Sequence, residues 1–179
     1  GASVDIQGSW VAIGSPGRVG GGTSYRYDVA NNGGLIGASS PYVASTAGTS
    51  VRIFNGGSNV LMGDPTSTNG GQGGQVWMSG INGYLQSTTA NEYFGWRLAL
   101  SNNNTVFVGA PNNATGGANA GRVYLSNYGG TGYQSNIQTI SPPTPTANDQ
   151  FGFAVASAGN RVVIGAPGHD SAGPNAGAV

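Results

Sequence analysis

The sequence predicts an all-β fold made of repeated antiparallel sheets. Of the 179 residues, 34 are glycines and 9 are prolines, and only 7% are charged, which is typical of short strands joined by many turns. A short apolar run that ends in Gly-x-Pro occurs four times, with its glycines at Gly14, Gly63, Gly109 and Gly165. A period of roughly 50 residues indicates one supersecondary unit used repeatedly.

Each unit opens with a predicted β-hairpin. A second glycine precedes each Gly-x-Pro glycine at a nearly constant distance, at Gly1, Gly48, Gly95 and Gly152. The residues that follow it, such as Ser3–Ile6 and Ser50–Ile53, alternate as half-buried strands do. Turn residues come next, at 7–9, 55–58, 101–104 and 158–160. The apolar run before Gly-x-Pro is therefore expected to return as the second strand.

Two further strands are predicted after Gly-x-Pro. A glycine-rich loop leads to a third strand at 74–78 and at 121–125, with Tyr25–Tyr27 as a looser counterpart. A fourth strand is expected at Tyr84–Ser87, after an Asn82-Gly83 hairpin turn, and another at Asn136–Ile140.

A unit of this length with four short antiparallel strands has the size of a propeller blade. The predicted fold is thus a β-propeller of four-stranded antiparallel blades, either an incomplete ring or part of a larger propeller. Its units are predicted at residues 1–46, 47–93, 94–150 and 151–179, with the last one incomplete.

The last two units share a further pattern around their glycines. One runs from Phe151-Gly152 through Gly165-Ala166-Pro167 to Val179, and the other from Phe94-Gly95 through Gly109-Ala110-Pro111 to Tyr124. This pattern resembles the FG-GAP repeat, known from integrin α-subunit propellers and many bacterial surface proteins. The first two units are degenerate copies. The resemblance implies a propeller fold and an extracellular location, secreted or on the cell surface.

The same resemblance raises the question of calcium. In integrin blades the turn between the Phe-Gly strand and the Gly-Ala-Pro strand commonly holds a calcium loop rich in Asp. The four equivalent turns of this chain contain no Asp or Glu, so a hard cation would lack its carboxylate ligands there. We therefore expect no metal in these turns and no cofactor.

Charge and composition limit the classes of partner that the chain is expected to bind. The chain has no Lys, and six Arg balance six acidic residues, which gives a polyanion such as nucleic acid no basic surface. Without Cys there is neither a disulfide nor thiolate chemistry. No 18-residue apolar run is present, so we expect no membrane insertion by this segment.

Residues that resemble catalytic groups each have a simpler interpretation. His169, the only histidine, precedes Asp170 and Ser171, but adjacent residues in one loop seldom give triad geometry. We interpret it as a solvated loop histidine. The carboxylates available for glycosidase chemistry are expected instead to cap turns or to pair with arginines; they are Asp5, Asp28, Asp64, Glu92, Asp149 and Asp170.

Arginines, aromatic residues and glycine clusters are likewise interpreted as structural. Arg52 and Arg97 are expected to donate hydrogen bonds between blades. A sugar-stacking surface is the alternative for Trp10, Trp77, Trp96, Tyr124 and Tyr128, but Trp77 and Tyr124 share one repeat position, which favours blade packing. The glycine clusters at 20–22, 70–71 and 116–117 lack the strand-to-helix context of a phosphate-binding loop.

The predicted function is a non-catalytic extracellular or cell-surface interaction or adhesion module that binds a protein or glycan through its blade loops. No catalytic, cofactor-binding or metal-binding residue is predicted. Two alternatives stay open. The chain is a structural subunit of an extracellular assembly or filament, with copies of itself as partners, or it is a non-catalytic portion of a secreted polysaccharide-degrading enzyme.

The last unit breaks off at Val179, where the matching copy continues as Val123-Tyr124-Leu125. An unclosed sheet exposes backbone donors and acceptors along its edge. We therefore expect strands from outside these 179 residues to complete the last blade, supplied by the same polypeptide or by a neighbouring subunit.

Overall fold

The computed structural model describes residues 1–18, 21–39, 46–68, 73–80, 83–102, 104–129, 132–133 and 138–179. In these ranges the regular structure consists of antiparallel β-strands and one short 3-10 helix, η1 (Val29–Asn31). The all-β prediction is therefore confirmed.

The first two sheets each contain four strands in chain order. The first sheet comprises β1 (Ser3–Gln7), β2 (Trp10–Ser15), β3 (Thr23–Asp28) and β4 (Gly34–Ser39). The second comprises β5 (Ser50–Phe54), β6 (Asn59–Asp64), β7 (Gln75–Met78) and β8 (Tyr84–Gln86). The strands predicted in these two units are all present, whereas Asn82 of the predicted hairpin turn lies outside the described residues.

The third sheet has a divided outer edge, and the fourth is a hairpin. In the third sheet β9 (Arg97–Leu100), β10 (Thr105–Ala110) and β11 (Arg122–Gly129) follow one another, and β11 pairs with both β12 (Gly132–Tyr133) and β13 (Gln138–Ile140). The fourth sheet consists of β14 (Ala154–Ala158) and β15 (Arg161–Gly165), followed by a single bridge between Ala166 and Ala178. Asn136, predicted in the outer strand, lies outside the described residues. The expectation that outside strands complete this sheet stays a prediction.

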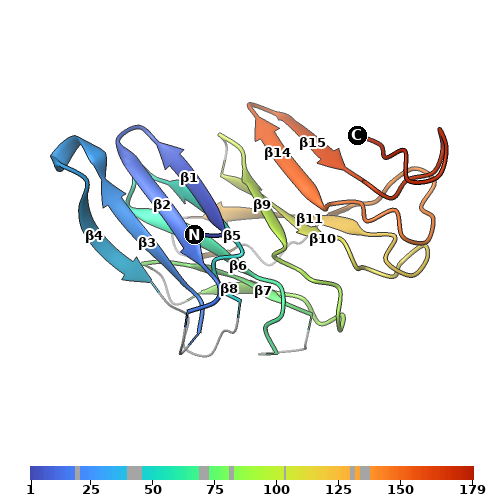
Figure 1. Ribbon diagram of the computed structural model, residues 1–179, viewed down its shortest axis with the longest axis horizontal. Coiled ribbons are helices and arrows are strands. Elements are labelled where there is room, and N and C mark those ends of the chain that lie inside the picture. Colours follow the sequence, from blue (N-terminus) through green and yellow to red (C-terminus); the bar gives the residue numbers. More distant parts are fainter. Residues whose placement is uncertain are drawn as a thin grey trace.

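The sheets lie side by side in an arc that runs from the first sheet to the β14–β15 hairpin (Figure 1). The first strands of the sheets, β1, β5, β9 and β14, contact one another in succession. This is the arrangement of blades in a partial β-propeller, as the sequence predicts. Each Gly-x-Pro motif ends the second strand of its sheet, because proline has no amide hydrogen to continue the ladder.

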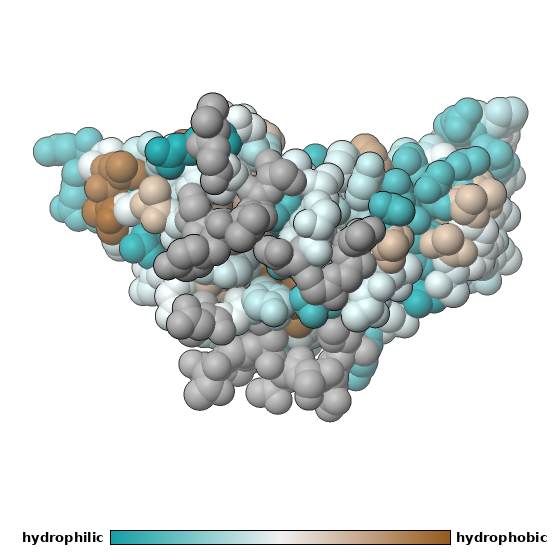
Figure 2. Space-filling view, turned by 90° about the horizontal axis from the view of Figure 1, so that it is seen from below, coloured by the Kyte–Doolittle hydropathy of each residue, from teal (hydrophilic) through white to brown (hydrophobic). Residues whose placement is uncertain are grey.

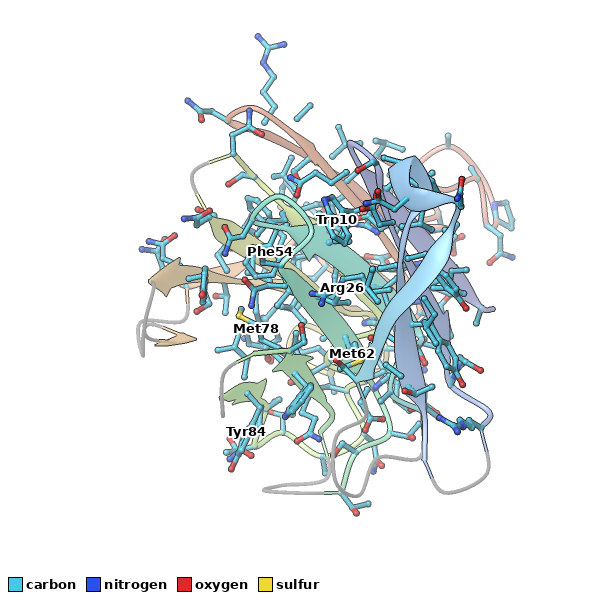
Figure 3. All side chains as sticks on the ribbon, turned by 90° about the vertical axis from the view of Figure 1, so that its left-hand side faces the viewer. Trp10, Arg26, Phe54, Met62, Met78 and Tyr84 are labelled. Carbon is cyan, nitrogen blue, oxygen red and sulfur yellow. The ribbon has the colours of Figure 1, made fainter. Side chains whose placement is uncertain are left out.

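The hydrophobic core is divided into three layers, one between each pair of neighbouring sheets. Met62 packs in the layer toward the first sheet, whereas Phe54 and Met78 pack in the layer toward the third. Figure 3 shows these side chains on opposite sides of the second sheet. A third layer, which includes Phe107 and Val155, joins the third sheet to the hairpin. Each inner sheet is therefore buried on both faces.

The predicted equivalence of four strand positions is confirmed by register. Val4, Val51, Leu98 and Val155 each pair with the residue that precedes the Gly-x-Pro glycine of the same unit. Three of them are buried, but Val4 is 61% exposed. The prediction that all four face inward is therefore wrong for Val4, because no sheet covers that face of the first sheet in the described structure.

A repeated glycine contact sets the distance between sheets. A Cβ atom added to Gly63 would lie 1.9 Å from the carbonyl oxygen of Gly95, and one added to Gly109 would lie 2.2 Å from that of Gly152. Gly14 meets the carbonyl of Gly48 in the same way, at 2.1 Å. In every case the Gly-x-Pro glycine of one sheet contacts the second-glycine position of the next. The backbones are thus too close for any side chain.

This contact predicts that adding one methyl group at a Gly-x-Pro glycine strongly destabilises the fold. Gly109→Ala should lower the free energy of unfolding by about 3 kcal/mol, because the added carbon overlaps backbone that cannot move independently. Gly17→Ala is the matched control, since the space around Gly17 is open. Urea unfolding of both variants measures the difference. Equal stabilities would show that the sheets are not held at this distance.

Candidate functional site

A cavity of about 740 Å³ opens where the first strands of the four sheets converge. Its polar lining residues come from β1, from β5 and its turn, from the β9–β10 turn and from β14; they are Asp5, Gln7, Arg52, Asn55, Ser101, Asn102, Asn104 and Ser157. Apolar lining is contributed by β5, β9 and β14, including Leu100 and Ala156. The cavity is more polar than the two hollows beside the C-terminal segment, which are lined mainly by apolar residues.

Turn chemistry brings the amide side chains to this cavity. Asn55 and Asn104 have φ angles of 52° and 61°, a left-handed conformation that Asn tolerates better than most residues. Both lie in turns between the first and second strands of their sheets. The Oε1 atom of Gln7 accepts a hydrogen bond of 3.1 Å from the amide of Gly56, which links the equivalent turn of the first sheet to the second.

Arg52 is the cation of the cavity. Its Nη1 atom donates to the carbonyl of Val51 at 2.8 Å and lies 4.0 Å from Oδ1 of Asp5. The other oxygen of Asp5 accepts a 2.8 Å hydrogen bond from the amide of Ile53. Burial lowers the pKa of Arg52, Asp5 opposes this effect, and the positive charge of Arg97 adds to it. Arg52 is thus partly desolvated and incompletely neutralised.

Asp5 and Arg52 make up the one Arg–carboxylate pair, at 4.0 Å, among the residues that the structure describes. The other carboxylates cap turns or accept from uncharged donors. Asp28 accepts from the amide of Ala30 at 3.0 Å, and Asp170 accepts from that of Asn175 at 2.6 Å. The turn-capping part of the prediction is therefore confirmed, whereas pairing with arginine applies to Asp5 alone.

Asp64 is a buried carboxylate whose pKa is raised. Its Oδ1 accepts a 2.6 Å hydrogen bond from the hydroxyl of Thr46, while its Oδ2 is buried without a partner among the described residues. Burial raises the pKa of the Asp64 carboxyl, although the hydrogen bonds act in the opposite direction. The Asp64 carboxylate joins the segment before β5 to the end of β6, and Asp64 is not among the residues that line the cavity.

A second set of carboxylates recurs at one position of the repeat. Glu92 and Asp149 each precede the Phe-Gly pair by two residues and are fully buried. Each contacts the residue four positions after the Gly-x-Pro glycine: Asn113 donates to Glu92, and His169 Nδ1 lies 3.1 Å from Asp149 Oδ1. These contacts tie the loops at one end of the blades together.

The interpretation of His169 as a solvated loop residue is wrong. Its side chain is 17% exposed, because it packs against the buried carboxylate of Asp149. The neighbouring Asp170 is exposed and binds the backbone of Asn175 instead. The sequence places Asp170 next to His169, whereas the carboxylate that contacts His169 is Asp149. Aligning the repeats, which matches Asp149 with Glu92, would have indicated this contact.

Burial by itself would raise the pKa of Asp149, but hydrogen bonds from Thr146 and His169 outweigh it and hold the pKa below its ordinary value. The ionised carboxylate therefore stabilises the fold above about pH 4, the ordinary Asp pKa, and this contribution is lost as the pH falls through the lowered value.

We expect Asp149→Asn to lower the free energy of unfolding by about 2 kcal/mol at pH 7. The deficit should shrink under acid conditions, where the wild-type carboxyl is itself protonated. Urea unfolding at pH 7 and at about pH 3 measures the difference. Asp170→Asn, at an exposed position, is the control. A deficit that is equal at both pH values would contradict the role assigned to the carboxylate.

Among the described residues Arg26 donates between blades, whereas Arg52 donates within its own strand, so the prediction for Arg52 is wrong. The same prediction for Arg97 stays a prediction. Arg26 Nη1 donates to the carbonyls of Gly57 and Ser58 at 2.9 and 2.6 Å, which joins the first sheet to the β5–β6 turn. Its guanidinium carbon lies 5.8 Å from the centre of the Trp10 ring, and Figure 3 shows both side chains beside the second sheet. Arg26 lies between Tyr25 and Tyr27 in β3, on the opposite face of the strand. The alternation of the strand therefore gave no sign that Arg26 donates between blades.

The aromatic residues pack between blades, as predicted for Trp77 and Tyr124. Both pair in register with the residue before Gly-x-Pro and join the core layers. Trp10 also packs in the first layer, and Tyr128 packs edge-on against Phe54. Of the glycine clusters, 116–117 lies in a turn with positive φ values, Gly21 and Gly22 are described, and Gly20 and 70–71 lie outside the described residues.

Metal ligands are sparse. Among the described residues, no group of three or more His, Cys, Asp or Glu is placed to hold a metal ion. The cavity is bordered by amide side chains at the turns that carry calcium ligands in integrin blades. Asn and Gln offer single neutral oxygens, which bind Ca²⁺ more weakly than carboxylates.

We therefore expect a chelator to leave the thermal midpoint unchanged, because stabilisation by a bound metal requires a site that favours the folded state. Differential scanning fluorimetry with excess EDTA, and then with excess Ca²⁺, checks this. A reproducible fall of the midpoint in EDTA that Ca²⁺ reverses would reveal a calcium site.

Comparison with known proteins identifies the repeat. A family model described as FG-GAP repeat matches residues 87–126 and 135–179, the two segments around Phe94-Gly95 and Phe151-Gly152. A search of curated proteins found no match to the chain. In the described ranges no helix is long and apolar enough to span a membrane. FG-GAP repeats build β-propeller modules often involved in extracellular interactions. The second half of the chain, which forms the third sheet and the β14–β15 hairpin, thus carries two FG-GAP repeats.

Proposed function

We propose that the chain is a non-catalytic extracellular or cell-surface interaction module, and that its cavity binds a carboxylate group of a protein or glycan partner. The observation that carries the proposal is Arg52. The part of its guanidinium that is not used by Val51 has no hydrogen-bond acceptor among the described residues and adjoins the cavity. A guanidinium presents planar paired donors that match a carboxylate.

The surroundings support binding more than catalysis. Asp5 is held by the amide of Ile53, so it neutralises Arg52 only in part. Asn and Gln side chains supply both donors and acceptors for the hydroxyl or amide groups that accompany a carboxylate in a uronic acid or an acidic peptide. A concave site with a few convergent polar groups is the usual form of a ligand site.

A structural subunit of an extracellular assembly is the second candidate. It is favoured by apolar side chains exposed on the terminal sheets, among them Val4, Ile6 and Val163. A binding module and a self-associating subunit are compatible, since Val4 lines the cavity but Ile6 and Val163 do not.

Binding is tested by titration calorimetry with oligogalacturonate and with an oligoglutamate peptide, each beside an uncharged counterpart. We expect the wild type to bind at least one acidic probe, and Arg52→Gln to weaken that binding about tenfold or more, the effect of one lost charged hydrogen bond. Arg161→Gln, at an exposed arginine outside the cavity, should bind as the wild type does. Failure of both acidic probes, or equal loss in the two variants, would reject the cavity as the site.

A further inference from the structure

The cavity of the proposed carboxylate site holds one arginine among many neutral polar groups. Apart from Arg52 and Asp5, its polar lining consists of amide and hydroxyl side chains; they are Gln7, Asn55, Ser101, Asn102, Asn104 and Ser157. Amide and hydroxyl groups both donate and accept hydrogen bonds. A ligand that matches this lining carries a single negative charge among several uncharged donors and acceptors.

The length of the turns decides where the amides lie. The turn between the first and second strands has two residues in the first sheet, 8–9, and in the β14–β15 hairpin, 159–160. In the second and third sheets the same turn has four residues, 55–58 and 101–104. These longer turns carry Asn55, Asn102 and Asn104. The two inner sheets therefore place amide side chains along one border of the cavity.

Backbone and side-chain hydrogen bonds hold these turns. The amide of Asn104 donates to the carbonyl of Ser101 at 3.2 Å, and the carbonyl of Asn104 accepts from the amide of Tyr128 at 2.9 Å. In the other turn, Nδ2 of Asn55 donates to Oδ1 of Asn59 at 3.0 Å. Because the turns are ordered before a ligand arrives, little conformational freedom is lost on binding.

One position of the repeat gives the cavity a charged half and an apolar half. Each first strand contributes the residue whose partner lies two positions before the Gly-x-Pro glycine; in chain order these are Asp5, Arg52, Ala99 and Ala156. The first two form the charged pair, whereas the last two offer only methyl groups. A uronic acid combines the same features, since its ring has a face of C–H groups, a rim of hydroxyls and one carboxylate.

An acidic peptide fits this lining less well. Among the residues that the structure describes, Arg52 is the one cation that lines the cavity, and Asp5 lies 4.0 Å from it. A run of carboxylates would bring like charges close to Asp5. On the face that Figure 2 shows, strongly hydrophobic residues, which the side chains of a peptide would contact, are gathered at the end where the first sheet lies.

We propose that the cavity binds an acidic oligosaccharide in which one uronic acid lies among neutral sugars. The inference rests on the proposed carboxylate site: Arg52 pairs with the carboxylate of the uronic acid. Amides such as Asn55 and Asn104 bond the hydroxyls, and Ala156 lies against the C–H face of a ring. The cavity volume of about 740 Å³ is in the range of small-molecule sites and admits a short oligosaccharide.

Titration calorimetry of the full chain with three probes tests this. They are an acidic tetrasaccharide that carries one glucuronic acid on xylotriose, the neutral xylotetraose, and a blocked tetrapeptide with one glutamate. The wild type should bind the acidic tetrasaccharide at least about tenfold more tightly than either of the others. Arg52→Gln should remove the preference for the acidic tetrasaccharide over xylotetraose.

Asn104→Gly removes one amide and keeps the backbone unstrained, because glycine accepts the φ angle of 61° at this position. It should weaken binding of the acidic tetrasaccharide about fivefold, the effect of one neutral hydrogen bond. Asn32→Gly is the matched control, since Asn32 is also exposed, has a φ angle of 60° and lies outside the cavity. This variant should bind as the wild type does, and circular dichroism confirms that all variants are folded.

The outcomes separate this inference from the carboxylate site on which it rests. If the peptide binds as tightly as the acidic tetrasaccharide, or if Asn104→Gly has no effect, the glycan inference is overturned while the carboxylate site stands. If Arg52→Gln leaves binding of the acidic tetrasaccharide unchanged, or if xylotetraose binds equally well, both are rejected. If the acidic tetrasaccharide does not bind, the glycan inference fails, and oligogalacturonate and oligoglutamate decide whether the carboxylate site stands.

Discussion

The close approach of glycine backbones between neighbouring sheets is the constraint on which this structure depends. The Gly-x-Pro glycine of each sheet meets the carbonyl of the glycine that opens the next unit, at Gly14 and Gly48, Gly63 and Gly95, and Gly109 and Gly152. The second member of each pair has a positive φ angle, between 91° and 97°, a conformation that only glycine adopts readily. Glycine thus permits both the close approach of neighbouring sheets and the positive φ angle at the start of the next unit.

A second contact of the same kind explains the aromatic residue beside that glycine. The carbonyls of Phe94 and Phe151 lie against Gly74 and Gly121, which begin the third strands of the preceding sheets, and the amides of both phenylalanines donate to the same loops. Their rings then enter the core layers beside the sheets they join. The Phe-Gly pair therefore holds the second and third strands of one blade against the start of the next blade. The phenylalanine ring occupies volume in the core layer between the two sheets.

Much of the fold was predictable because strand alternation and the repeated glycines are local features of the sequence. What was not predictable depended on neighbours distant in the chain. Val4 matches Val51 in pattern, yet only the succession of sheets decides that one is covered and the other is not. His169 and Asp149 are far apart in sequence and meet across two loops. Arg52 stood out as a strand cation, but its place in a cavity follows from the convergence of four separate strands.

The repeat separates what must stay constant from what is free to change. The glycine contacts recur at all three junctions between sheets, with Ala47 in place of phenylalanine at the first. In contrast, Gln7 at the end of β1 and the turn residues Asn55 and Asn104 take no part in those contacts. The side chains of these turns can therefore differ between blades without a change in blade packing. The same separation lets Arg52 reach the cavity from a strand whose opposite face, through Val51 and Ile53, is buried in the core. A binding site built on such turns can vary in chemistry while the stack of sheets that supports it remains the same.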